Sequence, residues 1–170
     1  MEGIREVAKF MAIAARTAPK AVGRDFLQIR IIEGDEVRKL ADAMVKFGDE
    51  GGRKGFDRDA KGVRNSDAVV LIGLKDAEPV GLNCGACGLN SCSELKPEEK
   101  KEFRGPQCAF RILDLGIAIG SAAKTASLFN VDNRIMYRAG TAARKAGFMD
   151  ADLVVGIPLS ATGKNIFFDR

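Results

Sequence analysis

The segment Ser66-Asp67-Ala68-Val69-Val70-Leu71-Ile72-Gly73-Leu74 carries an unbroken apolar run of strand length near the middle of the chain. Its β-branched residues favour a strand, and the lack of polar residues within the run is typical of a strand that is buried on both faces. Such a strand has to be covered by other elements. We therefore expect one sheet that is built around this segment.

Helices and strands are predicted on both sides of this central strand. Apolar spacing predicts helices over 2–18, 35–47, 107–129 and 140–146, and strands over 26–32, 134–137 and 152–158. Residues 48–63 are rich in glycine and charge without a period, so we expect a flexible loop there. Residues 97–103 are expected to form a short polar helix. The pattern predicts a single α+β or α/β domain over 1–170.

The composition is ordinary for a globular chain and excludes several classes of function. Of the 170 residues, 46% are hydrophobic and 29% are charged. The longest apolar stretch is too short to cross a membrane, and no targeting signal is visible, so we expect a cytoplasmic protein. The net charge of +4 is not gathered into a basic patch, which argues against nucleic-acid binding. The absence of histidine excludes His-based acid–base catalysis and Cys-His pairs.

All the cysteines of the chain fall in one stretch, at Cys84, Cys87, Cys92 and Cys108. Three clustered thiolates with one remote thiolate are the usual ligands of a cubane iron–sulfur cluster. Glycines between them allow the backbone to fold around the sulfurs. Cys108 begins an apolar helical run, so the positive end of that helix dipole would face an anionic cluster. The sequence therefore predicts one [4Fe-4S] cluster.

Three other uses of the cysteines stay open. A structural zinc site can use four cysteines, but it usually takes two Cys-x2-Cys pairs, and only one such pair exists here. A thioredoxin-like redox pair could use Cys84 and Cys87, which would leave the other two cysteines without a role. A disulfide framework suits short secreted chains, and this chain shows no signal peptide.

Several short segments of the sequence resemble segments of the FMN-dependent nitroreductase superfamily. The phrase Ala14-Ala15-Arg16-Thr17-Ala18-Pro19-Lys20-Ala21-Val22-Gly23-Arg24-Asp25 is similar to the turn that joins the opening helix of that superfamily to its first strand. The helix over 114–131 resembles its central dimer helix, and Val154-Val155-Gly156-Ile157-Pro158-Leu159 resembles a late strand that ends in Gly-x-Pro. With the cysteine loop included, nearly the whole chain resembles an uncharacterised prokaryotic family described as containing a ferredoxin domain.

The resemblance implies a nitroreductase-like three-layer fold, with a central mixed or antiparallel sheet flanked by helices and a cysteine-rich, cluster-binding insertion at about 81–108. It also implies a homodimer with FMN at the interface. Residues 17–25, residues 136–140 and the C-terminal tail would then line the FMN site. Four cations could meet the FMN phosphate: Lys20, Arg24, Lys164 and Arg170. The chain lacks the Arg-Arg-Ser-x-Arg segment of nitroreductases, and Lys20, Gly23 and Asp25 replace the usual Ser, Asn and Gln.

Two functions follow from these observations. The first is an iron–sulfur redox protein, either an electron carrier or a small FMN-dependent oxidoreductase, which serves a partner protein or a small-molecule electron acceptor. The second is a binding or scaffold module without flavin, in which a four-cysteine zinc or cluster site only stabilises the fold. The missing phosphate-binding segment favours the second function, and the spacing of the cysteines favours the first.

Overall fold

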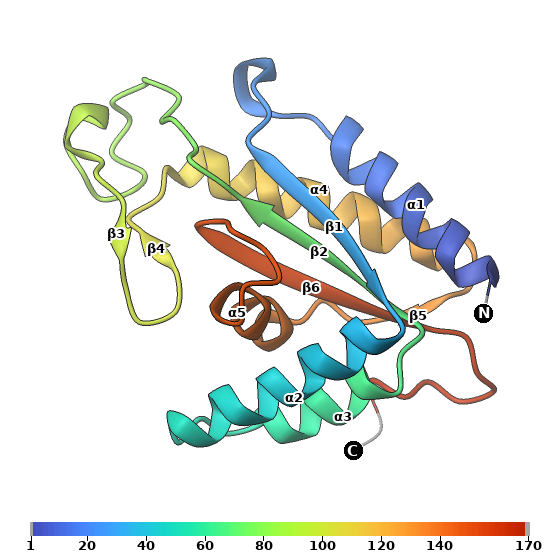
Figure 1. Ribbon diagram of the computed structural model, residues 1–170. Helices are drawn as coiled ribbons and strands as arrows, with labels where there is room; N and C mark the ends of the chain where they lie inside the picture. Colours follow the sequence, from blue (N-terminus) through green and yellow to red (C-terminus); the bar gives the residue numbers. More distant parts are fainter. Residues whose placement is uncertain (1, 169–170) are drawn as a thin grey trace.

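A four-stranded antiparallel sheet with the order β1-β2-β6-β5 lies at the centre of the computed structural model, which describes residues 2–168 (Figure 1). Its strands are β1 (Leu27–Glu33), β2 (Ala68–Leu74), β6 (Leu153–Ser160) and the short β5 (Asp132–Asn133). The start of β1, the end of β2 and the start of β6 are paired at one end, which we call the cysteine end. At the opposite end, which we call the tail end, Ala68 pairs with Leu159. A seven-residue strand separates the two ends by roughly 20 Å.

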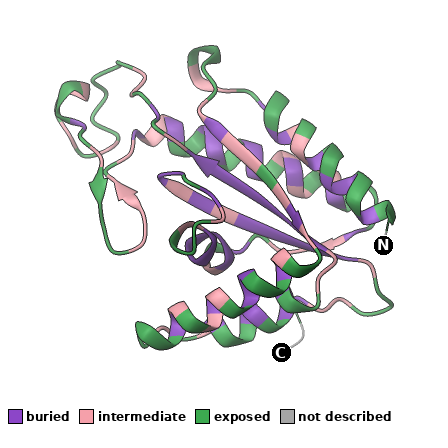
Figure 2. Cartoon of the chain, in the orientation of Figure 1, coloured by how far each residue is buried: buried purple, intermediate pink, exposed green. Residues whose placement is uncertain are grey.

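Helices cover both faces of the sheet, which confirms the expected three-layer α+β fold (Figure 1). One face carries α1 (Glu2–Thr17) and α4 (Ala109–Leu128), and the other carries α2 (Asp35–Glu50), α3 (Phe56–Arg64) and α5 (Tyr137–Lys145). The central strand β2 is buried along its whole length, as predicted (Figure 2).

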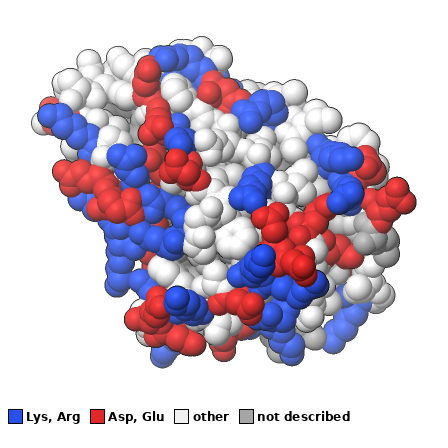
Figure 3. All heavy atoms as spheres, viewed as in Figure 1, with Lys and Arg blue, Asp and Glu red and all other residues white. Residues whose placement is uncertain are grey.

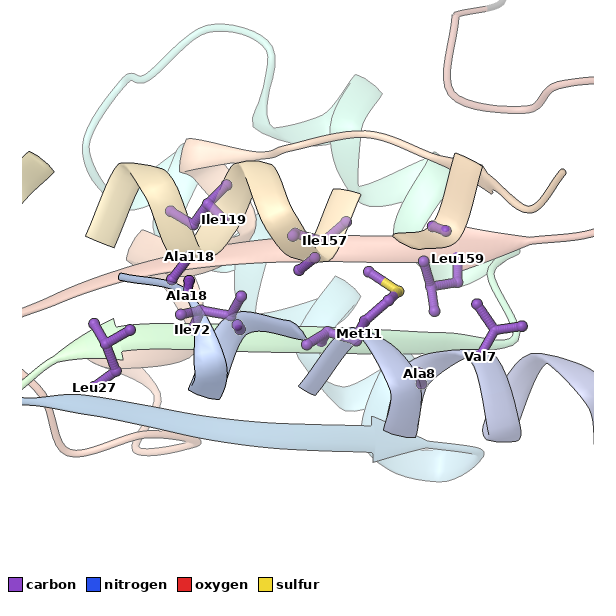
Figure 4. Packing of buried hydrophobic residues seen from close by; sticks show 14 of the residues in the cluster. Val7, Ala8, Met11, Ala18, Leu27, Ile72, Ala118, Ile119, Ile157 and Leu159 are labelled. Atoms are coloured by element: carbon purple, nitrogen blue, oxygen red, sulfur yellow. The ribbon is translucent and has the colours of Figure 1, made fainter. Parts of the chain in front are cut away.

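Alternate residues of β2 enter two separate hydrophobic cores because successive side chains of a strand point to opposite faces. Val70 and Ile72 pack with α1 and α4, whereas Val69 and Leu71 pack with α2, α3 and α5. Figure 4 shows the first core, where Met11 of α1 and residues of α4 meet the side chains of the sheet. None of the helices in the described residues combines the length and the apolar composition that crossing a lipid bilayer would need.

The prediction of a flexible loop over 48–63 is wrong, because this segment contains helix α3. Phe56, Ala60 and Val63 recur at helical spacing and are buried in the core that α2 and α5 share. The helix begins after Gly55, which has a left-handed φ of 81°. Charged residues on the outer face of α3 concealed this short apolar stripe.

The prediction of a polar helix over 97–103 is also wrong, because a small hairpin of β3 (Glu98–Glu99) and β4 (Arg104–Gly105) forms there. Glu99 accepts hydrogen bonds from Arg144 and Lys145 of α5, and these ion pairs lower the pKa of its carboxyl group to about 2. Contacts with α5 therefore prevail over the local helical preference of this charged segment.

The predicted strand over 134–137 is displaced in the structure. The strand β5 lies at Asp132–Asn133, a single bridge joins Met136 to Gly156, and Tyr137 already belongs to α5. The absence of a side chain at Gly140 lets the first turn of α5 lie directly against the backbone of β6. The remaining predicted helices and strands occur within a few residues of their expected bounds.

Candidate functional site

The four cysteines all belong to the part of the chain that joins β2 to α4 at the cysteine end of the sheet (Figure 1). Cys84 and Cys87 lie in an open loop, and Cys92 begins the short 3-10 helix η2 (Cys92–Glu94). The β3–β4 hairpin follows, and Cys108 then forms the N-cap of α4, as its position before an apolar run predicted. All four thiols are free; Cys84 is exposed, Cys87 and Cys92 are half-buried, and Cys108 is buried.

The backbone of the cysteine loop turns sharply, and one side chain fixes part of it. Gly81, Gly85 and Gly88 have positive φ angles, which glycine adopts at little cost. Asn83 also has a positive φ, and its Oδ1 atom accepts a hydrogen bond from the Cys92 backbone N–H at 2.8 Å. The backbone N–H of Asn83 in turn donates to the Cys92 Sγ atom at 3.4 Å. Asn83 therefore positions Cys92 and supplies the kind of N–H donor that stabilises a metal-bound thiolate.

The environment of Cys108 favours its thiolate form. Burial raises the pKa of the Cys108 thiol, but the backbone N–H groups of Val80, Arg111 and Phe110 and the positive charge of Arg111 lower it. The lowering effects prevail, so the pKa lies below its ordinary value. A buried thiolate at a helix N-terminus is a suitable ligand for a metal or a cluster.

A buried ion pair ties the cysteine segment to the turn after α1. Arg111 and Asp114 lie one turn apart on α4, and Arg111 Nη1 donates to Asp114 Oδ2 at 3.0 Å. Arg111 also donates to the carbonyl oxygens of Glu78 and Ala21, at 2.9 and 3.0 Å. Asp114 Oδ1 accepts the Ala21 backbone N–H at 2.8 Å. Sequence reasoning missed this pair, although an Arg and an Asp three residues apart within an apolar helical run were a signal for it.

In chemical type these residues fit an iron–sulfur cluster: four thiols, a lowered pKa at Cys108 and an N–H donor at Cys92. In the part of the chain that the structure describes, no three His, Cys, Asp or Glu side chains converge closely enough to hold a metal ion. Binding would therefore have to draw the sulfurs together. The exposed, glycine-rich loop that carries Cys84 and Cys87 is the part that can move.

The predicted phosphate contacts that the structure describes do not lie together in one protomer. Lys20 donates to the carbonyl oxygens of Ala15, Arg16 and Ala18 at the end of α1, and burial lowers the pKa of its ammonium group. Arg24 forms an ion pair with Glu78 at 2.7 Å. These two residues precede β1 at the cysteine end, whereas Lys164 follows β6 at the tail end. Arg170 lies outside the described residues.

A cationic cavity of about 310 Å³ lies at the tail end. Its walls include the following residues from α3, the segment before α5 and the tail: Arg58, Lys61, Arg134, Met136, Ile166 and Phe167. Among the described residues of the wall, the one carboxylate is that of the buried Asp59, which pairs with Arg58 at 2.8 Å and with Arg138 at 2.7 Å. The surplus of positive charge suits an anionic ligand. This cavity could not be predicted from the sequence, because the segment that forms α3 was expected to be a loop.

One family and several known proteins are similar to this chain. The profile of a family described as "uncharacterized protein containing a ferredoxin domain" matches residues 104–170. An uncharacterized protein from Archaeoglobus fulgidus is 52% identical over 171 residues, covering 99% of this chain and 92% of that protein.

Solved nitroreductase structures share the fold. A nitroreductase with bound FMN from Desulfitobacterium hafniense has a TM-score of 0.60 at 11% identity, covering 94% of this chain and 78% of that one. The FMN-dependent nitroreductase NfnB from Mycobacterium smegmatis, in complex with NADPH, has a TM-score of 0.63 at 11% identity with the same coverage. A nitroreductase family protein from Clostridium novyi has a TM-score of 0.62 at 14% identity, covering 97% and 77% of the two chains. The predicted nitroreductase-like α+β fold is therefore confirmed.

Proposed function

The chain belongs to the family described as uncharacterized proteins containing a ferredoxin domain, and on this premise we propose that it is an iron–sulfur redox protein. In this proposal Cys84, Cys87, Cys92 and Cys108 hold one [4Fe-4S] cluster. Residues 1–170 form one domain that carries 81–108 as its cluster-binding insertion. The observation that carries the proposal is the gathering of all the cysteines at one end of the sheet, with Cys108 as the N-cap of α4.

The residues around the cysteines support electron transfer at this end of the molecule. A cluster, when bound, supplies one-electron chemistry. Asn83 would hold Cys92 in place, and the N-terminus of α4 would stabilise the negative charge near Cys108. Residues 79–93 contain no Asp, Glu, Lys or Arg. Figure 3 accordingly shows a mostly uncharged area over this loop. Because Cys84 is exposed there, a partner protein or a small-molecule acceptor could approach the cluster closely.

The test is analysis of protein that is purified without oxygen for iron, sulfide, zinc and visible absorbance. We expect broad absorbance at about 400 nm, as for thiolate-bound cubanes, with equal amounts of iron and sulfide. Colourless protein with stoichiometric zinc would contradict the proposal. That result would instead establish the alternative function, a module that uses four cysteines as a structural metal site.

A specific observation also favours an FMN-linked reductase, namely the cationic cavity at the tail end. Nitroreductases with the same fold bind FMN, and the phosphate of FMN needs cations. We propose that the tail brings Lys164 and Arg170 to this phosphate, in addition to the cations Arg58, Lys61 and Arg134 that line the cavity. Lys20 and Arg24 lie at the other end of the sheet, so they could contact the same FMN only from a second copy of the chain. Resolved flavin bands in the same spectrum, with FMN released on denaturation, are the expected result. Protein without flavin would contradict this part of the proposal.

An exposed apolar face on α1 and α4 supports a homodimer. Phe10 stacks on Phe129 with the ring centroids 5.6 Å apart, and Ile13, Leu113 and Ile117 are also exposed on these two helices. Gly116 and Gly120 of α4 have open space above them, so another helix could approach closely. A face of this kind usually marks an interface between proteins.

Ile117→Lys is expected to convert the dimer into monomers because it places a charge in the middle of this apolar face. Ile117 is 45% exposed in one protomer, so the variant should fold normally. Light scattering after size-exclusion chromatography measures the mass. Ile135→Lys is the matched control, since Ile135 is 49% exposed but lies outside α1 and α4. A wild-type protein that stays monomeric at high concentration would exclude the homodimer.

A further inference from the structure

The guanidinium group of Arg111 is completely buried beside the predicted cluster ligand Cys108. Its Nε and Nη1 atoms are used in hydrogen bonds, whereas its Nη2 atom is buried without a hydrogen-bond partner. A buried donor without a partner is costly, and a fully buried cation more so. Structural hydrogen bonds alone therefore leave part of this side chain unexplained.

The hydrogen bonds of Arg111 direct its guanidinium group to the segment that also faces the sulfur of Cys108. Residues three apart on a helix are neighbours, and helical side chains point back toward the N-terminus, so Arg111 reaches toward its own N-cap. The carbonyl oxygen of Glu78 accepts a hydrogen bond from Arg111, while the backbone N–H of Val80 faces the Cys108 sulfur. The Arg111 guanidinium and the Cys108 sulfur therefore face the same segment, at Glu78 and at Val80. Two residues of extended chain span roughly 7 Å.

We propose that the buried charge of Arg111, partly balanced by Asp114, sets the reduction potential of the cluster that Cys108 helps to hold. This inference rests on the proposed function. Uptake of one electron makes a thiolate-bound cluster one unit more negative, and a nearby buried cation stabilises that reduced form more than the oxidised form. Water screens such an interaction weakly in the interior, in contrast to the interaction of a surface charge. In this proposal Arg111 is not a ligand of the cluster, and it changes the reduction potential through its positive charge.

The pair offers a test in which a purely structural role and a charge effect differ in sign. Arg111→Gln removes the positive charge, so the potential should fall. Asp114→Asn removes the negative charge that balances the guanidinium, so the potential should rise. If the pair only held the structure together, both variants would loosen the hydrogen bonds to Ala21. The reduction potential would then shift in the same direction in both variants.

The experiment is a redox titration of the loaded protein with chemical mediators, followed by electron paramagnetic resonance of the reduced cluster. We expect Arg111→Gln to lower the ratio of reduced to oxidised cluster at a fixed potential at least tenfold, which is about 59 mV for one electron. Asp114→Asn should raise this ratio, and Arg111→Lys, which keeps the charge, should fall between Arg111→Gln and wild type. Lys96→Gln removes an exposed cation four residues after Cys92 and is the control, with a shift well below tenfold.

Each outcome decides between the proposals. Shifts of opposite sign in Arg111→Gln and Asp114→Asn support the inference. Unchanged potentials, or shifts of the same sign, in variants with wild-type iron and sulfide content overturn it and leave the proposed function intact. Wild-type protein that takes up no cluster overturns the proposed function and this inference together. If Arg111→Gln fails to fold, Asp114→Asn and Arg111→Lys decide by the direction of their shifts.

Discussion

Cys108→Ser is expected to abolish the broad visible absorbance and to remove most of the bound iron and sulfide. Cys108 is the buried member of the four cysteines and forms the N-cap of the long helix α4. The hydroxyl group of serine is a poor substitute for a thiolate ligand, and the chain has no fifth cysteine that could take its place. The absorbance at about 400 nm and the iron and sulfide content of oxygen-free protein measure the effect.

Two further variants sharpen this prediction. Cys92→Ser should have the same effect, because the proposal makes Cys92 a ligand that Asn83 positions. Asn90→Ala is the matched control in the same loop, since Asn90 is exposed. Its spectrum should equal that of the wild type. An unchanged spectrum in both cysteine variants would refute the four-ligand assignment.

Gly140→Ala is expected to destabilise the fold by about 3 kcal/mol or more. A Cβ atom at this position would lie 2.0 Å from the carbonyl oxygen of Val154 and 2.4 Å from its carbonyl carbon. Both are backbone atoms of the buried strand β6, so no side-chain rotation can relieve the clash. The helix α5 would have to move away from the sheet, which would open the core that Val154 and Ala139 share. Chemical denaturation monitored by circular dichroism gives the change in the free energy of unfolding.

Gly3→Ala is the control for this substitution. Gly3 also lies within a helix, α1, but a Cβ atom there would have nothing within 4 Å. Removal of the helical glycine should therefore leave the stability equal or raise it by up to about 1 kcal/mol. If the two variants unfold at the same denaturant concentration, the close approach of α5 to β6 does not exist as described.

The central and helical parts of the fold could be predicted because their signals are local. The apolar run that became β2 and the periodic residues of α1 each identify their own structure. By contrast, α3 and the β3–β4 hairpin depend on partners elsewhere in the chain. Phe56 and Val63 are helical core residues only because α2 and α5 cover them, and Glu99 holds the hairpin only because Arg144 lies opposite.

The same distinction between local signals and distant partners applies to the residues of the candidate site. The cysteines and the start of α4 at Cys108 could be read from spacing alone, whereas the role of Arg111 could not. This side chain joins Glu78 and Ala21, which lie 33 and 90 residues away in sequence. The cationic cavity likewise needs α3 and the tail to meet. Lys20, one of the predicted phosphate contacts, instead caps the end of α1 through three carbonyl oxygens, an arrangement that no charge pattern reveals.

The placement of the cysteine segment has a consequence for how the protein matures. Neither hydrophobic core draws a buried residue from 81–107 in the part of the chain that the structure describes. Both hydrophobic cores can therefore form without a bound cofactor, so the proposed cluster would be assembled on a scaffold that is already folded. Newly made chains would then wait, folded and thiol-bearing, for delivery of iron and sulfide. During that interval the exposed thiol of Cys84 would be open to oxidation.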